Sequence, residues 1–348
     1  MARLAPSVAA IRRAVRAALT GSSLTGSSLT GSAPSGPAPV GLALTGPVLV
    51  ACSGGADSLA LAAAAAFVGP RIGVPVGLVT VDHGLQAGSA QRAADVAAWA
   101  SAAGLVPVEV ATVDVAGRPG GPEAAARAAR YAALTAAGRR HGAHVLLGHT
   151  LDDQAETVLL ALARGAGPRG LAGMPPRRDV DGVALLRPLL GVSRADTRAA
   201  CAAQGLAVWA DPHNSDARYA RARVRADALP ALVAALGPAV VDNLARTASL
   251  LAADAALLDA QAAQALAAAR VPAGLSAQRL AGLPPAIRTR VLHAWARELG
   301  APGAALSHRH VAALDALVVG RRGQGATALP GGILVSCRAG LLHPVSER

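Results

Sequence analysis

The sequence predicts an α/β protein with a parallel sheet and helices on both of its faces, followed by a smaller and mostly helical domain. Between residues 47 and 164, short apolar segments alternate with segments of helical periodicity. This alternation is typical of βαβ units, whose strands run parallel. Aromatic residues make up only 2% of the chain, which favours closely packed, alanine-rich helices over a sandwich of two sheets.

The N-terminal part is expected to contain one helix and a disordered linker, together residues 1–46. Residues 5–19 place apolar side chains at helical spacing, with arginines on the other face. Residues 20–41 repeat a five-residue pattern rich in Gly, Ser and Thr and then become rich in Pro and Gly. Such a segment buries too little apolar surface to order itself.

Residues 47–230 are expected to form the sheet domain, and residues 231–348 a mostly helical one. The expected strands are 48–52, 76–82, 106–113 and 144–149, and the expected helices are 89–103, 122–140, 151–164, 239–270, 284–299 and 307–319. A further helix rich in Ala and Leu follows the first strand, and the last residues are typical of a small hairpin. Ligands of parallel sheets lie beyond the carboxyl ends of the strands, so the chemistry is expected in the loops that follow them.

The charge of the chain favours a polyanionic partner. Its formal net charge is +12, and all 33 basic residues are arginines. A strongly basic protein attracts nucleic acid through a field that does not depend on base sequence. RNA or DNA is therefore the expected partner.

Cysteine usage and the N-terminus indicate a reducing compartment. Cys52, Cys201 and Cys337 lie far apart and form no CxxC pair, which argues against a disulfide framework, a zinc knuckle or a clustered iron–sulfur site. Arginines interrupt the N-terminus where a signal peptide needs an apolar run. No uncharged apolar stretch is long enough to span a membrane, so a soluble, cytoplasmic protein with no membrane partner is expected.

A glycine-rich loop between the first strand and its helix is the strongest chemical signal. The loop consists of Ser53, Gly54, Gly55, Ala56, Asp57 and Ser58. Two glycines let a phosphate approach the backbone amides closely, and the helix N-terminus that follows favours an anion. Asp57 supplies a carboxylate for a Mg²⁺ that bridges phosphates. The loop is not a Walker A motif, because the Lys-Ser/Thr pair is absent.

This loop resembles the PP-loop of the N-type ATP pyrophosphatases, Rossmann-like proteins that cleave ATP between its α and β phosphates. Further segments resemble one branch of that superfamily, the tRNA(Ile)-lysidine synthetases, from about residue 48 to residue 229. These segments are VDHGL (81–85), EAAARAARY (123–131), GHTLDDQAET (148–157) with the loop after it (164–174), RPLL (187–190), DPHN (211–214) and YARARVR (219–225). The C-terminal part is similar, less specifically, to the helical substrate-binding region of that family.

The resemblance implies a two-step reaction on an isoleucine tRNA with a CAU anticodon. ATP would first adenylate the C2 oxygen of the wobble cytidine, and the ε-amine of free lysine would then displace AMP to give lysidine. The resemblance further implies that ATP contacts the phosphate loop, Asp82, His83 and Arg127, with Arg127 near the α-phosphate. The alternatives are a surface ion pair for Arg127 and a purely structural role, as hydrogen-bonded loop residues, for His83 and His149.

Three acidic residues at the start of the 151–164 helix are candidates for the lysine site. Asp152 and Asp153 lie in its first turn, and Glu156 shares a face with both. A capping box with the preceding threonine explains Asp153 alone. By resemblance, Asp153 and Glu156 bind the ammonium groups of lysine, and Asp152 and His149 belong to the same site. The residues do not identify which carboxylate accepts the proton of the ε-amine.

A basic segment near the end of the sheet domain is the candidate tRNA contact. Its arginines are Arg221, Arg223 and Arg225, which are expected to meet phosphates; a solvated basic face is the alternative. Ala222 and Ala226 stand where the family often has Asn and His, and Pro168 lies in the loop after the acidic helix. These departures concern tRNA contacts more than the type of reaction.

Two other functions fit parts of this pattern. A tRNA thiolase of the same superfamily would need a nucleophilic or cluster-binding cysteine, whereas Cys52 and Cys201 lie in segments typical of a core. An RNA-binding protein without catalysis would need neither Asp57 nor the pair of Asp153 and Glu156.

Overall fold

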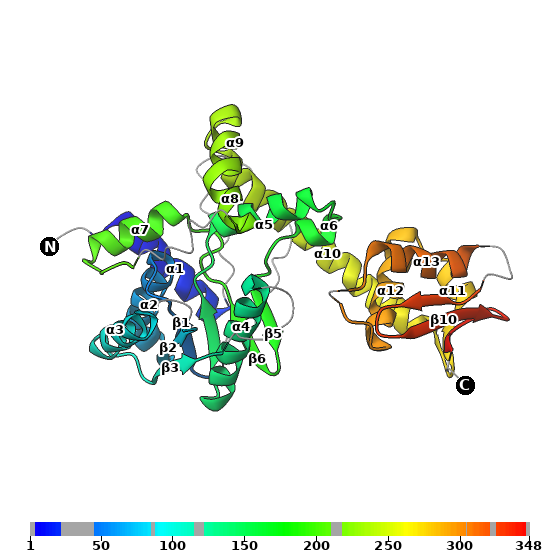
Figure 1. Ribbon diagram of the computed structural model, residues 1–348, viewed down its shortest axis with the longest axis horizontal. Coiled ribbons are helices and arrows are strands. Elements are labelled where there is room, and N and C mark those ends of the chain that lie inside the picture. The colour runs from blue at the N-terminus through cyan, green and yellow to red at the C-terminus, as the bar shows by residue number, and fades with distance from the viewer. Residues whose placement is uncertain are drawn as a thin grey trace. The chain divides into compact units, whose positions relative to one another are not determined.

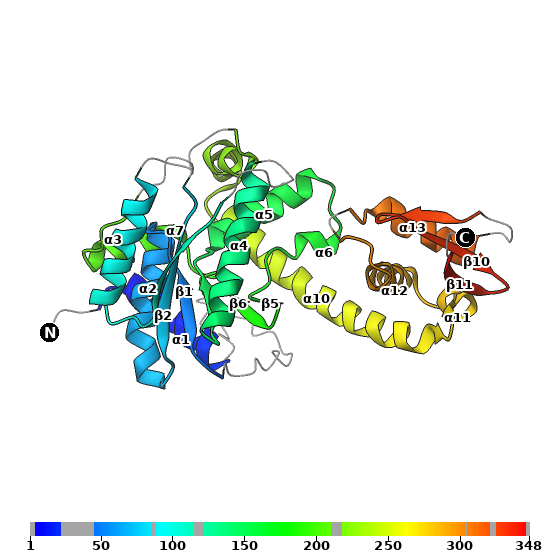
Figure 2. The ribbon, with the colours of Figure 1, turned by 60° about the horizontal axis from the view of Figure 1, so that its bottom comes forward.

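The computed structural model describes residues 4–21, 45–84, 88–114, 122–209, 218–303, 305–320 and 325–345. The chain divides into two compact units, Met1–Ser249 and Leu250–Arg348, whose elements are drawn in Figure 1 and, from a second direction, in Figure 2. The predicted linker, apart from its first two residues, lies outside the described residues, as does the DPHN segment.

A six-stranded sheet forms the centre of unit 1. Its strands follow the order β3-β2-β1-β4-β6-β5, and all neighbouring pairs are parallel except β5 with β6. The strands are β1 (Val48–Ala51), β2 (Val76–Asp82), β3 (Val108–Thr112), β4 (His144–Leu147), β5 (Arg177–Val180) and β6 (Val183–Leu186). The predicted parallel sheet is confirmed, and an antiparallel edge strand adds to it.

Helices cover both faces of this sheet (Figure 2). Val48 and Val50 of β1 face a core made with α1, α2, α3 and α7, whereas Leu49 faces a core made with α4, as the alternation of side chains along a strand requires. The helices of unit 1 are α1 (Pro6–Thr20), α2 (Ala56–Val68), α3 (Ser89–Ala102), α4 (Pro122–Arg140), α5 (Leu151–Ala163), α6 (Pro168–Leu171), α7 (Arg194–Ala203), α8 (Ala220–Arg223), α9 (Leu229–Leu236) and the first part of α10 (Val240–Ala269). A π-helical turn, η3 (Val224–Ala228), joins α8 to α9.

The strand order places a crevice at β1 and β4. The chain moves outward from β1 through β2 to β3 and then returns to the other side of β1 as β4, so the loops after β1 and β4 diverge at this point. These two loops approach each other closely, because a Cβ atom on Gly148 would lie only 3.1 Å from the amide nitrogen of Ser58. The end of β4 therefore packs directly against the first turn of α2.

The described part of unit 2 combines the second part of α10 and the helices α11, α12 and α13 with a small antiparallel sheet. The sheet order is β7-β8-β11-β10-β9, and a core that includes Val291, Trp295 and Leu314 lies against it. The elements are β7 (Arg270–Val271), β8 (Gly274–Ser276), α11 (Ala277–Ala281), α12 (Pro285–Glu298), α13 (His308–Val319), β9 (Thr327–Leu329), β10 (Ile333–Arg338) and β11 (Leu341–Val345). The sequence predicted α12, α13 and the terminal hairpin; the strands β7, β8 and β9 span only two or three residues, too few to show an alternating pattern.

None of the helices in the described part of the chain is by itself long and apolar enough to cross a membrane. Two helical stretches, Ala220–Leu236 and Val240–Ala269, meet that test only when joined, and they are bent by 102° at their junction.

The helix α1 packs into the core of unit 1, so truncation of one of its buried side chains should lower the stability of the unit. Ile11 is fully enclosed among residues of α2 and α7, whereas Arg13 on the same helix is exposed. We expect Ile11→Ala to lower the free energy of unfolding by about 2–5 kcal/mol because it leaves a cavity. Arg13→Ala, the matched control, should change it by less than about 0.5 kcal/mol. Urea unfolding followed by circular dichroism measures both, and equal stability of the two variants would contradict the placement of α1.

Candidate active site

The loop between β1 and α2 forms a tight turn at the N-terminus of a helix. The Ser58 hydroxyl accepts a hydrogen bond from the Ser53 amide (3.2 Å) and donates one to the Gly55 carbonyl (2.9 Å). Gly54 has a φ of 85°, a conformation that favours glycine. Gly55 precedes α2 without a side chain to cap it, so the first amides of the helix remain available to a phosphate.

A cavity of about 890 Å³ lies beside this loop, a size typical of small-molecule sites. The polar residues on its wall come from the loop, from the ends of β2 and β4, and from α4, α5, α7 and η3. They are Ser53, Asp57, Ser58, His83, Arg130, His149, Asp153, Arg194, Arg198 and Arg225. The predicted phosphate loop and the predicted acidic helix therefore face one shared space.

The first turn of α5 is fixed by a capping box. The Thr150 hydroxyl accepts from the Asp153 amide (3.4 Å), and Asp153 Oδ2 accepts from the Thr150 amide (2.8 Å) and hydroxyl (2.9 Å). The capping interpretation of Asp153 is thus confirmed. Its other oxygen, Oδ1, is left for partners outside the helix.

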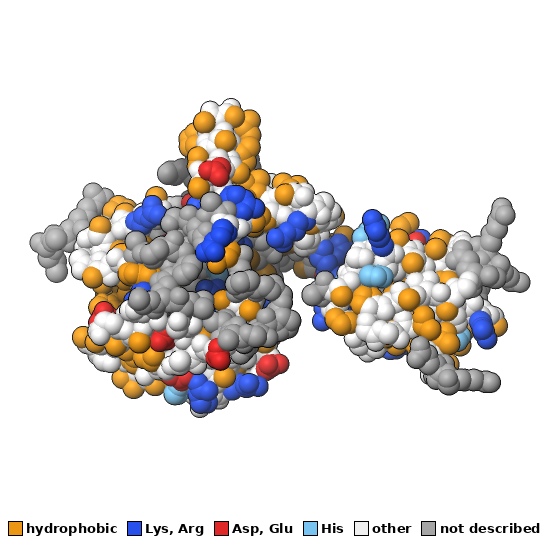
Figure 3. Space-filling model, viewed as in Figure 1, with side chains coloured by type: hydrophobic (Ala, Val, Ile, Leu, Met, Phe, Trp, Pro, Cys, Tyr) orange, Lys and Arg blue, Asp and Glu red, His pale blue; other side chains and the backbone are white. Residues whose placement is uncertain are grey.

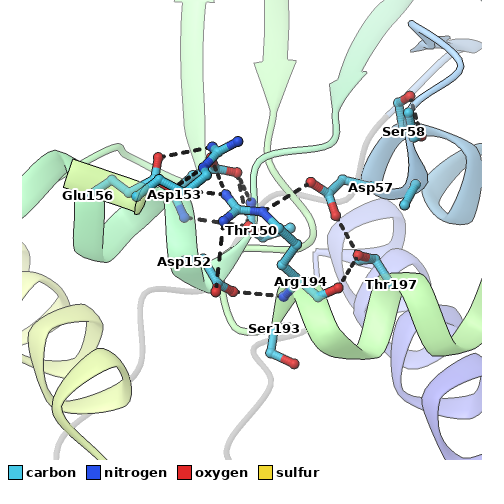
Figure 4. A network of polar contacts seen from close by, with 12 residues as sticks. Asp57, Ser58, Thr150, Asp152, Asp153, Glu156, Ser193, Arg194 and Thr197 are labelled. Carbon is cyan, nitrogen blue, oxygen red and sulfur yellow. Dashed lines mark hydrogen bonds and ion pairs between the residues drawn. The ribbon is translucent and has the colours of Figure 1, made fainter. Parts of the chain in front are cut away.

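Arg194, the first residue of α7, connects all the acidic residues of the site (Figure 4). Its Nη2 atom lies 3.0 Å from Asp153 Oδ1 and 3.1 Å from Glu156 Oε1, and its Nε atom lies 3.8 Å from Asp57 Oδ2. Its backbone amide donates to Asp152 Oδ2 (2.7 Å). The side chain is only 12% exposed, so these are contacts in a largely desolvated place where charge matters most.

Glu156 is fully buried and holds a second arginine. Arg225 Nε lies 2.7 Å from Glu156 Oε1, and Arg225 Nη2 lies 3.1 Å from Oε2 and 3.3 Å from Asp153 Oδ1. Arg221 donates to the Thr157 hydroxyl (3.0 Å) and lies 3.9 Å from Glu156. Arg221 and Arg225 share one face of the α8–η3 helix, as their spacing of four residues requires.

Burial and neighbouring charges shift the pKa values of Asp57 and Asp153, the two aspartates that face the cavity, in opposite directions. Burial is the main reason that the pKa of Asp57 lies above its usual range, although a hydrogen bond from Thr197 opposes the shift. Burial also opposes the ionisation of Asp153, but Arg194 and the donors of Thr150 outweigh it and hold the pKa of Asp153 below its usual range. Asp57 is therefore the more basic of the two carboxylates.

His149 is kept neutral by its surroundings. Burial, assisted by nearby arginines, lowers the pKa of His149 to about 3. The Nδ1 atoms of both His149 and His83 are buried without a hydrogen-bond partner in the described part of the chain, and both residues line the cavity. Unpaired buried polar atoms are uncommon, and here they point to a site that takes a polar ligand.

Two family models match the chain. Residues 43–232 match one described as a PP-loop domain, and residues 275–343 match one described as a TilS substrate binding domain. A tRNA(Ile)-lysidine synthase of Salinispora tropica is 68% identical over 347 residues, which cover 99% of this chain and 98% of that protein. A tRNA(Ile)-lysidine synthase of Streptomyces coelicolor is 56% identical, over 85% of this chain and 84% of the relative. The chain belongs to the tRNA(Ile)-lysidine synthase family.

One solved structure shares the fold of this family member at low sequence identity. A U34-tRNA thiolase from Methanococcus maripaludis, solved with its [4Fe-4S] cluster, superimposes with a TM-score of 0.53 at 18% identity, over 70% of this chain and 80% of that one. The likeness concerns the fold alone.

Several residues expected to take part in the lysidine synthase site lie away from the cavity wall. Asp82 caps the turn after β2 through the Gly84 amide (3.0 Å), and Arg127 is exposed beside Tyr131. Asp152 and Glu156 do not line the cavity. Asp152 accepts a hydrogen bond from the Arg194 amide, and Glu156 forms ion pairs with Arg194 and Arg225. Among the three arginines of the basic segment, Arg223 is exposed and donates to the Arg218 carbonyl (3.0 Å), away from the acids.

The three departures from the family pattern are accommodated locally. Pro168 is the first residue of α6, a position that suits proline. Ala222 is buried and Ala226 is exposed.

The described residues hold no group of three His, Cys, Asp or Glu side chains arranged to bind a metal. Asp57 is the carboxylate of the phosphate loop that faces the cavity, and it is 26% exposed. Mg²⁺ is commonly held by one or two carboxylates together with phosphate oxygens and water. Asp57 could therefore serve as the single protein ligand of a Mg²⁺ that phosphates also bind, whereas the described residues offer no site made of several protein ligands.

The sequence did not predict a place in the site for Arg194, Thr197 or Trp209, which approach or line the cavity in the structure. Ser193 and Asp196 cap α7 through the Asp196 amide (3.1 Å) and a 2.6 Å hydrogen bond between their side chains. The Ser-x-x-Asp spacing is a helix-start signal that could have located α7. No local pattern, however, predicts that Arg194 at the start of α7 contacts acidic residues about 40 positions earlier in the chain.

Removing the charge of Arg194 should destabilise unit 1 in a manner that depends on pH. Arg194→Gln leaves Asp153 and Glu156 short of one cation in a buried place, which costs about 3–5 kcal/mol at pH 7. Arg198→Gln is the matched control, because Arg198 also lines the cavity but is exposed.

The sign of the pH effect follows from the lowered pKa of Asp153. A carboxylate with a lowered folded-state pKa contributes stability above its unfolded pKa of about 3.9 and loses it as the pH falls through the lower folded value. The difference between wild type and Arg194→Gln should therefore be full at pH 7 and shrink below about pH 4. Urea unfolding across this range measures it, and a difference that stays constant down to pH 3 would contradict the pairing.

Proposed function

We propose that this protein uses ATP to join free lysine to C2 of the wobble cytidine in an isoleucine tRNA with a CAU anticodon, forming lysidine. The observation that carries this proposal is the shared cavity: an anion-binding loop and a charged carboxylate, Asp153, face one space of about 890 Å³. Membership of the tRNA(Ile)-lysidine synthase family over nearly the whole chain supports it.

In the first step, the C2 oxygen of cytidine attacks the α-phosphorus of ATP and pyrophosphate leaves. The amides at the start of α2 and the Ser53 hydroxyl can donate to the phosphates, whereas the Ser58 hydroxyl donates to the Gly55 carbonyl within the loop. Arg130 and Arg198 on the cavity wall can offset negative charge that develops on them. A Mg²⁺ held by Asp57 and phosphate oxygens would neutralise the leaving pyrophosphate.

In the second step, the ε-amine of lysine attacks C2 of the adenylated cytidine, AMP leaves, and the amine loses a proton. A free ε-ammonium has a pKa of about 10.4, so a base must accept that proton at neutral pH. Asp57 is assigned to Mg²⁺, so Asp153 is the other carboxylate on the cavity wall that can accept this proton. The neutral His149 is a poor base, since its pKa is about 3.

The charges around Asp153 are complementary to a free amino acid. Lysine carries ammonium groups, which suit Asp153, and one carboxylate, which suits a guanidinium. Arg194 and Arg225 already contact Asp153 Oδ1 at 3.0 and 3.3 Å. An arriving ammonium would therefore share this oxygen with an arginine or displace it, and Glu156, buried behind, would retain the displaced guanidinium.

Basic side chains near the cavity support an RNA substrate. On the face drawn in Figure 3, arginines gather on unit 1 around α8 and α5. Arg223 is the exposed member of the predicted tRNA-contacting set, whereas Arg221 and Arg225 bind the acids of α5. We assign phosphate contact to Arg223 and a positioning role to the other two.

The cysteines do not support the thiolase alternative. Burial raises the pKa of Cys201 to about 11 and raises that of Cys52 as well. Both thiols are thus protonated at neutral pH, and a protonated thiol is a poor nucleophile and metal ligand. Cys337 belongs to unit 2.

The proposal predicts a lysine-dependent change in the mass of one cytidine. Purified protein, ATP, lysine and unmodified isoleucine tRNA are incubated, and the RNA is digested to nucleosides for mass spectrometry. We expect a cytidine that has gained lysine with loss of water, formed only when both ATP and lysine are present. Omission of lysine is the control. The proposal would be contradicted by a sulfur-containing nucleoside, or by cytidine that stays unmodified when folded protein, ATP, lysine and the tRNA are all present.

A further inference from the structure

Trp209 lies on the cavity wall directly beside the phosphate loop. Its backbone amide donates to the Gly54 carbonyl (3.0 Å), and a Cβ atom on Gly54 would lie 3.7 Å from Trp209 Cβ. Leu206 and Val208 line the same cavity. The segment that leaves α7 therefore returns across the phosphate loop and brings an indole ring to the site.

Arg92 of α3 backs this ring. The Arg92 guanidinium carbon lies 3.2 Å from the centroid of the Trp209 ring, a stacking contact that holds an aromatic plane in place. Arg92 covers one side of the indole, yet Trp209 remains partly exposed and lines the cavity. The cavity wall therefore includes a residue whose aromatic ring is held in place by Arg92.

An aromatic residue on the cavity wall is notable because the chain contains very few aromatic residues. The chain has only six aromatic residues of the Phe, Trp and Tyr types, and Trp209 is the one that lies among the described residues of the cavity wall. Others are used for packing: Trp295 is buried in unit 2, and Phe67 and Trp99 pack against the first core of unit 1. The hydrogen bond to Gly54 needs only the backbone of residue 209, so the ring serves a different purpose.

We propose that Trp209, backed by Arg92, is a stacking platform for a nucleobase in the active-site cavity. Every nucleobase presents a π-face that stacks on an aromatic side chain, and such stacking contributes to affinity whatever the base sequence. The inference rests on the proposed function, which brings two bases to this cavity: the adenine of ATP and the target cytosine of the tRNA. Both present the same chemistry to the ring, and binding experiments distinguish them.

The test measures the binding of two ligands to wild type, Trp209→Ala, Trp209→Phe and Trp99→Phe. The ligands are ATP, titrated calorimetrically, and a fluorescently labelled anticodon stem-loop RNA with the CAU sequence, titrated by anisotropy. A second stem-loop is abasic at the target cytidine. Thermal unfolding of each variant verifies that it is folded. Trp99→Phe controls for the loss of a tryptophan that packs in the core.

We expect Trp209→Ala to weaken one of the two ligands by about five- to a hundredfold, while Trp209→Phe retains most of the affinity. A loss confined to ATP identifies adenine as the stacked base. A loss for the stem-loop that disappears with the abasic stem-loop identifies the target cytosine.

Equal affinities in wild type and Trp209→Ala for both ligands would overturn the inference, as would equal weakening of both ligands, which indicates a distorted cavity. Failure of the proposed function is recognised separately in the nucleoside analysis described above, which would then show no lysine-dependent change of cytidine, whereas the binding experiments test the stacking alone.

Discussion

The site depends on how two buried carboxylates of α5 are paired with arginines. Asp153 and Glu156 are almost inaccessible to water, and an isolated buried carboxylate would take up a proton or unfold its surroundings. Arg194 from α7 and Arg225 from η3 supply the missing charge within hydrogen-bond distance. The same arginine from α7 lies 3.8 Å from Asp57 of the phosphate loop. One guanidinium therefore links the loop after β1 to the helix after β4.

The sheet topology makes this linkage possible. Because β1 and β4 are neighbours on opposite sides of the point where the strand order reverses, their loops open into one crevice. The close approach of Gly148 to the first turn of α2 fixes the distance between the two loops. The helix α7 and the turn η3 then bring basic side chains to the crevice, so a ligand in the cavity meets fixed charges of both signs.

Much of the fold was predictable from the sequence because its signals are local. Strand β2 and helix α4 have the predicted bounds, since an apolar run and a proline at the first helical position mark them. The phosphate loop and the capping box of α5 were likewise predictable from short motifs. The partners of Asp153 and Glu156 were not, because Arg194 and Arg225 lie 38 to 72 residues away along the chain. Their contacts arise from packing of α5 against α7 and η3, which no local pattern encodes.

The most direct test of this account is the effect of Asp153→Asn on the two substrates separately. Asn keeps the shape of the side chain and an oxygen for the cap, but it lacks the charge that an ammonium requires. The account predicts that KM for lysine rises about ten- to a hundredfold, the loss of one charge-assisted hydrogen bond, while KM for ATP changes far less. Asp95→Asn, on the exposed face of α3, is the matched control and should alter neither. An equal rise of KM for ATP and for lysine would contradict the assignment of Asp153 to the amino acid.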